Sequence, residues 1–284
     1  MQIGFYTSTF SDRPIEEVLD FAQASGFDAV EIDVGGHIKS PDKVESVVTA
    51  ARDLGLTVSS IALFGNQLDS DLARRQTLRK STADFALAAA AAGVPTLVVF
   101  PGRDETASED ANYRNFADHL NSLIATGGSG ALTFAIENWP GPKDDFIATT
   151  PDGWKKIGAL VPDPRFGLEF DPSHLLRLGV DPYAAFDEVK DRIKILHAKD
   201  TAIDRARLQQ VGYSGQGWWR YVLPGLGMLD WMKFLRQARV AGYDGIVSVE
   251  HEDAEFGWPR NSLESRKEGE VRALAFLRET LSAL

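Results

Sequence analysis

The 284-residue sequence contains no cysteine, and this absence excludes disulfide bonds and thiolate metal sites while permitting a reducing compartment. The chain also lacks a basic balance. Its formal net charge is −11, and its five histidines could not reverse that sign even if all were protonated. Because phosphate binding normally needs a basic face, we expect no nucleic-acid partner.

Long apolar runs are missing as well. No stretch approaches the ~18 residues that a membrane helix needs, and the first residues, MQIGFYTSTF, show no basic segment followed by an apolar one. We therefore expect no membrane partner and a soluble, cytoplasmic protein. No linker rich in Pro, Gly or Ser divides the chain, which predicts one domain over residues 1–284.

The sequence does contain one unit that returns along the chain: a short β-rich run ending in polar residues, a loop and an amphipathic stretch. The expected strands are nearly continuously apolar, as in a parallel sheet buried on both faces. Eight such units predict a (β/α)8 TIM barrel. The alternative, an open doubly wound sheet, usually has fewer units and a glycine-rich phosphate turn. Capping residues precede proline at three expected helix starts, Ser40-Pro41, Thr150-Pro151 and Asp181-Pro182. The expected strands lie at 3–7, 29–34, 57–63, 96–100, 132–138, 166–172, 193–200 and 245–253.

Ligand-type side chains stand at the ends of the last four expected strands: Glu137, Asp171, His197 and Glu250. A lone acid there is more often a helix cap or a surface charge, and a lone histidine is more often satisfied by a carbonyl. All strands of a barrel end at one mouth, however, so these four should converge. Three carboxylates would repel one another without a cation between them. With one imidazole they suit a single divalent metal ion, Mn²⁺ first, with Mg²⁺, Co²⁺ or Zn²⁺ as alternatives.

The whole chain resembles the xylose isomerase-like TIM-barrel superfamily of sugar phosphate isomerases and epimerases. The motifs that carry the resemblance are AIEN, FDPSH, HAKD, LPGLGMLDW and GYDGIVSVEHED. The resemblance implies that Glu137, Asp171, His197 and Glu250 hold the metal in this order. It also implies that Glu137 and Glu250 are the catalytic acid/base pair, and that His174, three residues after the aspartate, contacts substrate oxygens.

The chemistry explains the need for such a set. Removing a proton next to a carbonyl gives an enediolate, and a metal on both vicinal oxygens stabilises its charge. One glutamate on each face can take the proton from one side and return it on the other. We therefore expect a metal-dependent isomerase or epimerase of a keto sugar or a 3-keto-glycoside, with a small sugar as substrate.

HAKD and EHED resemble the branch of the superfamily that acts on 3-keto-glycosides. In that branch the alternative outcome is elimination of the aglycone, a lyase reaction. Lys199, His251 and Glu252 would then be further residues at the barrel mouth, although a surface ion pair is an equal alternative for each.

Departures from the pattern argue against endonuclease IV, which needs extra histidines after its second, third and seventh strands. His37 follows the second expected strand, but the third and fourth end without histidine. A non-catalytic sugar-binding barrel is the rival outside enzymology, and the four intact strand ends argue against it. For assembly, a homo-oligomer and a complex with a partner subunit both stay open.

Smaller signals lie on the later loops. Trp139, Trp218 and Trp219 could form an aromatic wall that stacks on a sugar ring, with ordinary loop packing as the alternative. Arg205 and Arg207, in the long loop after His197, could bind an anionic substrate. The turn PGLG could cradle a phosphate, but a turn leading into the next helix is favoured.

Overall fold

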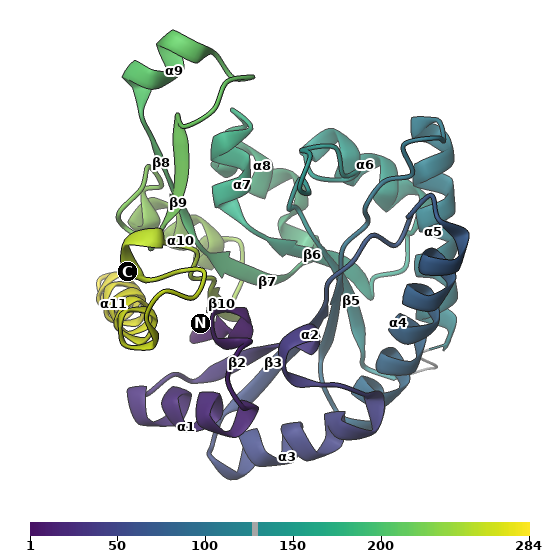
Figure 1. Cartoon of the computed structure of the whole chain (residues 1–284), viewed down its shortest axis with the longest axis horizontal. Coiled ribbons are helices and arrows are strands. Elements are labelled where there is room, and N and C mark those ends of the chain that lie inside the picture. Colours follow the sequence, from purple (N-terminus) through teal and green to yellow (C-terminus); the bar gives the residue numbers. More distant parts are fainter. Residues whose placement is uncertain (127–129) are drawn as a thin grey trace.

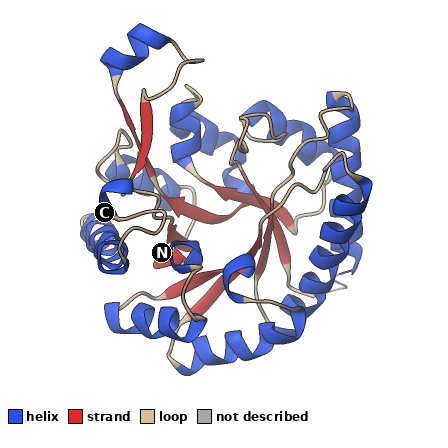
Figure 2. Ribbon diagram, in the orientation of Figure 1, coloured by secondary structure: helices blue, strands red, loops and turns tan. Residues whose placement is uncertain are grey.

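The computed structural model describes residues 1–126 and 130–284. Within this part of the chain, eight parallel strands close into a barrel, and helices surround it (Figure 1, Figure 2). This confirms the predicted (β/α)8 class. In barrel order the strands are β1 (Gln2–Tyr6), β2 (Ala29–Asp33), β3 (Thr57–Leu63), β4 (Thr96–Val99), β5 (Thr133–Glu137), β6 (Phe166–Phe170), β7 (Ile193–Ala198) and β10 (Ile246–Val249), which pairs back with β1.

In the described ranges, eight longer helices form the outer layer, and shorter ones lie in the connections. The outer helices are α1 (Ile15–Ser25), α3 (Val44–Asp53), α4 (Leu72–Ala92), α5 (Glu109–Thr126), α6 (Pro151–Leu160), α8 (Pro182–Val189), α10 (Trp231–Val240) and α11 (Leu263–Ser282). The shorter ones are η1 (Thr7–Phe10), α2 (Val34–His37), η2 (Pro41–Lys43), α7 (Pro172–Arg177), η3 (Lys190–Arg192), α9 (Arg205–Val211) and η4 (Ala254–Phe256).

The three predicted helix starts differ in how far the structure matches them. Asp181 caps α8 with its side chain, which accepts hydrogen bonds from the Tyr183 and Ala184 amides. Pro151 begins α6 as expected, but Thr150 makes no side-chain cap. Ser40-Pro41 begins the short helix η2 instead of α3 itself. The proline marks each start because its fixed φ suits the first turn, whereas the cap depends on the local side-chain rotamer.

The main apolar core lies between the strands and the surrounding helices. Because successive side chains of a strand point to opposite faces, every second strand residue points outward into this core. A separate small cluster, Tyr6, Ala62, Val98, Ala135 and Ile195, lies apart from that core. Ala135 and Ile195 stand two residues before Glu137 and His197 on the same strands. Side chains two residues apart share one face of a strand. Ala135 and Ile195 therefore lie in the layer directly beneath the polar residues of the barrel mouth.

The chain after β7 leaves the barrel in an excursion that the sequence analysis treated as a long loop. Here β8 (Asp200–Ile203) and β9 (Trp219–Val222) pair antiparallel, with α9 between them, and they protrude from the barrel (Figure 1). The turn PGLG follows β9. The amide of Gly225 in this turn and the amides of Met228 and Leu229 just after it donate to the carboxylate of Asp200. The turn therefore binds a side chain of this chain and leads into α10, as the favoured alternative expected.

None of the helices in the described ranges combines the length and apolar character needed to cross a membrane.

Candidate active site

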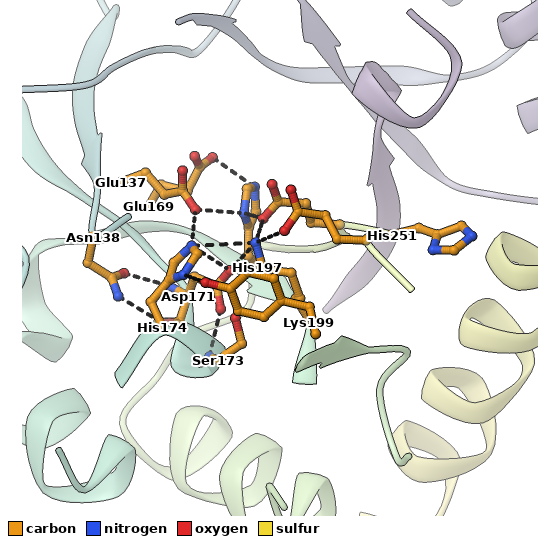
Figure 3. A network of polar contacts seen from close by, with 12 residues as sticks. Glu137, Asn138, Glu169, Asp171, Ser173, His174, His197, Lys199 and His251 are labelled. Atoms are coloured by element: carbon orange, nitrogen blue, oxygen red, sulfur yellow. Dashed lines mark hydrogen bonds and ion pairs between the residues drawn. The ribbon is translucent and has the colours of Figure 1, made fainter. Parts of the chain in front are cut away.

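The four predicted ligand residues meet at the C-terminal end of the barrel. They come from β5, the end of β6, β7 and the end of β10, which are neighbours in the sheet. One ligand atom from each residue lies within 4.8 Å of all the others. All four side chains are buried, and Figure 3 shows three of them, Glu137, Asp171 and His197, pointing toward one another. The convergence expected from the strand ends is present.

His197 lies between two groups of carboxylates. Its Nδ1 is 3.0 Å from Glu250 Oε2 and 3.6 Å from Glu137 Oε1, so this nitrogen faces the predicted ligand set. Its Nε2 is 3.0 Å from Glu31 Oε2 and 3.2 Å from Glu169 Oε1. Burial alone would lower the pKa of His197, but these surrounding carboxylates outweigh it and raise the pKa well above its usual value.

Glu31 and Glu169 were missed by the sequence analysis. They lie within β2 and β6, and both are buried inside the barrel. Burial and the nearby Glu31 charge raise the pKa of Glu169 well above its usual value. For Glu31, burial is outweighed by the positive charge of His197, so its pKa is lowered. The signal that could have revealed them is an acid in the middle of an otherwise apolar strand, which is costly unless it has a partner.

The two predicted acid/base glutamates differ in protonation. Burial, followed by the charge of Glu250, raises the pKa of Glu137 to about 8. Burial acts on Glu250 in the same direction, but the charges of Lys199 and His197 outweigh it and lower its pKa well below the usual value. Near neutral pH the site without a metal therefore holds a protonated Glu137 beside an ionised Glu250. Such a separation is typical of acid/base pairs.

The residues present fit a divalent cation. Asp171 Oδ1 accepts a hydrogen bond from the Ser173 amide, whereas its buried Oδ2 accepts none. The ammonium of Lys199 lies 3.2 Å from that Oδ2 and 2.6 Å from Glu250 Oε2, so it partly neutralises the cluster. Three carboxylates and an imidazole nitrogen are a donor set that Mn²⁺, Mg²⁺, Co²⁺ and Zn²⁺ accept. The cluster could therefore hold one metal ion.

His174, on α7, links this cluster to the protruding antiparallel pair of β8 and β9, which we call the hairpin. Its Nε2 lies 3.0 Å from Glu137 Oε1, and its Nδ1 lies 2.6 Å from the hydroxyl of Tyr221 on β9. Burial, followed by the charge of Lys199, lowers the pKa of His174 well below its usual value, so the ring is neutral. Tyr221 was not predicted, because the hairpin itself was not.

Two predicted substrate-binding residues are not brought to the cluster. The ring of His251 points away from it (Figure 3), and its Nε2 lies 3.2 Å from the carbonyl of Phe256. Arg207 is exposed on α9, where its Nε donates to the carbonyl of Gln216. His37, the last residue of α2, likewise lies away from the cluster, and its Nε2 contacts the carbonyl of Thr7.

A cavity of about 570 Å³, the inner pocket, opens above the cluster. Its lining includes Glu137, Glu250, Lys199 and Glu252, so the predicted mouth residues other than His251 reach it. One wall is aromatic, with ring centroids of Trp139 and Phe64 5.3 Å apart. Trp218, by contrast, is buried and donates from Nε1 to the Gly215 carbonyl, so it does not belong to this wall.

The fold and the site together define a class: a (β/α)8 barrel with a buried carboxylate–histidine centre at the C-terminal ends of its strands. The family model of the xylose isomerase-like TIM barrel matches residues 19–280. The chain belongs to this family, as its motifs indicated.

The chain is similar in sequence to several relatives and in fold to several solved structures. The uncharacterized protein YfiH of Bacillus subtilis is 26% identical over 89% of this chain and 93% of its own length. Inosose dehydratase of Lacticaseibacillus casei is 34% identical over 110 residues, 37% of each chain. The 3-keto-D-glucoside 4-epimerase of E. coli superposes with a TM-score of 0.74 at 21% identity, covering 98% of this chain and 99% of that one. The IOLI protein, solved with a zinc atom, has a TM-score of 0.70 at 18% identity, covering 99% and 96%.

Proposed function

We propose that this protein is a divalent-metal-dependent isomerase or epimerase of a keto sugar or a 3-keto-glycoside. The observation that carries the proposal is the meeting of Glu137 and Glu250. They come from opposite ends of the four-strand arc β5–β6–β7–β10, both reach His197 Nδ1, and both line the inner pocket. Two carboxylates with separated pKa values at one cavity suit removal and return of a single proton.

In the proposed reaction a glutamate takes the proton from the carbon next to the substrate ketone. The electron pair of that C–H bond passes into an enediolate. The other glutamate then gives a proton to the opposite face, which forms the new C–H bond, so the substrate is neither oxidised nor reduced. A divalent cation held by Glu137, Asp171, His197 and Glu250 would supply Lewis-acid stabilisation of the enediolate charge.

Other residues of the chain orient the substrate. Neutral His174 can exchange its Nε2 contact with Glu137 for a hydrogen bond to a substrate oxygen. The Lys199 ammonium, between Glu250 and Glu252, supplies a positive charge next to the ketone oxygen. The aromatic wall at Trp139 provides an apolar face for the sugar ring.

The comparisons support the substrate class and keep a second outcome in view. The E. coli structural neighbour is named for epimerising a 3-keto-glucoside, and the L. casei relative is named for dehydrating inosose. Elimination begins with the same proton abstraction, so a lyase that expels the aglycone is the second candidate. The zinc atom in the IOLI structure supports a metal on this fold; for this chain we favour Mn²⁺ because carboxylates dominate the donor set.

The test is proton NMR in D₂O with a panel of ketoses and 3-keto-glucosides and added Mn²⁺. An epimerase exchanges the hydrogen next to the ketone for deuterium and accumulates the epimer. A lyase exchanges the same hydrogen but releases aglycone with no epimer at any time. If no member of the panel shows exchange, elimination or epimer, the proposed function is wrong.

A further inference from the structure

The inner pocket is continuous with a second cavity of about 920 Å³, the outer groove. Trp139, Glu252 and Trp258 line both cavities, so the groove begins where the pocket ends. The inner pocket alone is already as large as many small-ligand sites. A single sugar ring therefore has no need of the outer groove, and a ligand that fills both cavities must extend beyond one ring.

The far wall of the groove is built by the hairpin. Trp219 and Tyr221 of β9 lie side by side, with ring centroids 4.8 Å apart. The guanidinium of Arg177, on α7, lies 4.4 Å from the Trp219 ring centroid and forms an ion pair with Asp144. Lys199 lies 4.6 Å from the Tyr221 ring. These contacts hold the aromatic side chains in place before any ligand arrives, and such preorganisation favours binding.

The same wall is joined to the chemistry. The Tyr221 hydroxyl contacts His174 Nδ1 at 2.6 Å, and His174 Nε2 contacts Glu137. The groove is thus connected to Glu137, one member of the proposed acid/base pair, through two side-chain contacts. A ligand that packs on the hairpin is positioned relative to the reacting carbon.

The chemistry of the lining indicates a neutral ring that carries hydroxyl groups. Aromatic faces offer an apolar surface for a flat ring, and the polar side chains of Ser214 and Gln216 offer hydrogen bonds around it. The two arginines among the described lining residues already have acidic partners, Arg177 with Asp144 and Arg220 with Glu255. This neutralisation disfavours a phosphate or another anion as the second group.

We propose that the outer groove is a subsite for the aglycone, and that the substrate is a 3-keto-glycoside whose aglycone is a neutral hydroxylated ring. The ring can be a second sugar or a hydroxylated aryl group, since both present a flat face edged by hydroxyls. This inference rests on the proposed function, because it takes the inner pocket as the place where the keto ring reacts.

The test compares three 3-keto-glucosides as Mn²⁺-dependent substrates: the methyl glycoside, the 3-keto derivative of cellobiose and the 4-hydroxyphenyl glycoside. We expect kcat/KM for at least one ring-bearing substrate to exceed that for the methyl glycoside by about tenfold. The difference should lie mainly in KM. The cellobiose and hydroxyphenyl arms show which kind of ring the groove prefers.

Variants of the far wall of the outer groove test whether the groove causes the preference for ring-bearing substrates. Trp219→Ala should reduce the ratio of ring-bearing to methyl substrate several-fold, and Trp219→Phe should restore part of it. Tyr213→Ala removes an exposed ring from the same lining and keeps the test valid if the Trp219 variant does not fold. Gln209→Ala, exposed on α9 outside the lining of the groove, is the matched control and should leave the ratio as in the original protein.

Cellobiose and 4-hydroxyphenyl glucoside lack the ketone and do not react. Their binding, measured by saturation-transfer NMR, separates failure of the aglycone subsite from failure of the proposed function. If proton exchange occurs but all three substrates react equally and Trp219→Ala changes no ratio, the subsite is refuted and the proposed function stands. If no substrate reacts but the unreactive glycosides bind through Trp219, the proposed function fails and the groove remains a ring-binding site. If neither glycoside binds and no preference exists, the subsite is refuted.

Discussion

The inner pocket and the outer groove differ in what builds them. The floor of the inner pocket is made of buried charges at the ends of neighbouring barrel strands, held in place by the sheet. The far wall of the outer groove is made of aromatic side chains on the excursion after β7, which is not part of the barrel. In the proposed function, the barrel supplies the reacting groups, while an inserted segment supplies the surface that selects the rest of the substrate.

The largest effect is expected at the proposed acid/base pair. Glu137→Gln or Glu250→Gln keeps an oxygen ligand but removes the base, and turnover should fall by ~10²–10⁴-fold. In an epimerase, one of the two variants should still exchange the substrate proton without inverting the centre. Steady-state rates and deuterium exchange followed by NMR make the measurement.

The matched control for this pair is Glu255→Gln, an exposed acid paired with Arg220 at the edge of the outer groove. It should leave proton exchange intact. Full activity in both Gln variants of the pair would show that neither glutamate is the base.

A smaller effect is expected beneath the floor of the inner pocket. Glu31 contacts His197 Nε2 at 3.0 Å and so fixes the ring with Nδ1 toward the other ligands. Glu31→Gln should weaken Mn²⁺ binding by ~10–100-fold, because partners of a ligating histidine commonly contribute that much. Isothermal titration with Mn²⁺ measures this. Unchanged affinity would mean that the orientation of His197 does not depend on Glu31.

The next prediction concerns His174, which joins the two regions. If it binds a substrate oxygen, His174→Ala should lower kcat/KM about tenfold, the cost of one hydrogen bond to substrate. Metal content, measured by plasma emission spectroscopy, should stay nearly the same. A collapse of metal content would instead make His174 a ligand, and the centre would then resemble that of endonuclease IV.

The smallest effect is a pH dependence of metal binding. A pKa of about 8 means that Glu137 is protonated at pH 7 in the metal-free protein, and metal binding requires the carboxylate. His197, whose pKa is also raised, must likewise lose a proton before its Nδ1 can bind the metal. Binding at pH 7 should therefore release more than one proton, and affinity should rise with pH. Calorimetry in buffers of different ionisation enthalpy measures the released protons. Affinity independent of pH between 6 and 8 would contradict the assignment.

The sequence predicted the barrel and the four residues at its centre because both follow from a simple rule. Parallel strands of a closed sheet end at one mouth, so polar residues at the ends of neighbouring strands must meet there. An acid within an apolar strand indicates a buried partner, but the partner of Glu31 and Glu169, His197, is identified only when the arrangement of the strands is known. The outer groove was missed because β8 and β9 are short and lie outside the repeating unit of strand and helix.

The prediction that His251 binds substrate failed for a physical reason that could have been seen in the sequence. Successive side chains of an extended chain point to opposite sides, so Glu250 and Glu252 face the inner pocket while His251 faces away. The same alternation puts His197 and Lys199 together in the cluster. Reading the motif EHED by alternation, instead of as a block of polar residues, would have excluded His251.

The central claim is that one divalent metal ion binds among Glu137, Asp171, His197 and Glu250. A crystal of the Mn²⁺-loaded protein, measured at the manganese absorption edge, tests it most directly. We expect one anomalous peak within ~2.0–2.6 Å of the three carboxylates and of His197 Nδ1. A peak on the other side of the ring, between Glu31, Glu169 and His197 Nε2, or no peak at all, would contradict it.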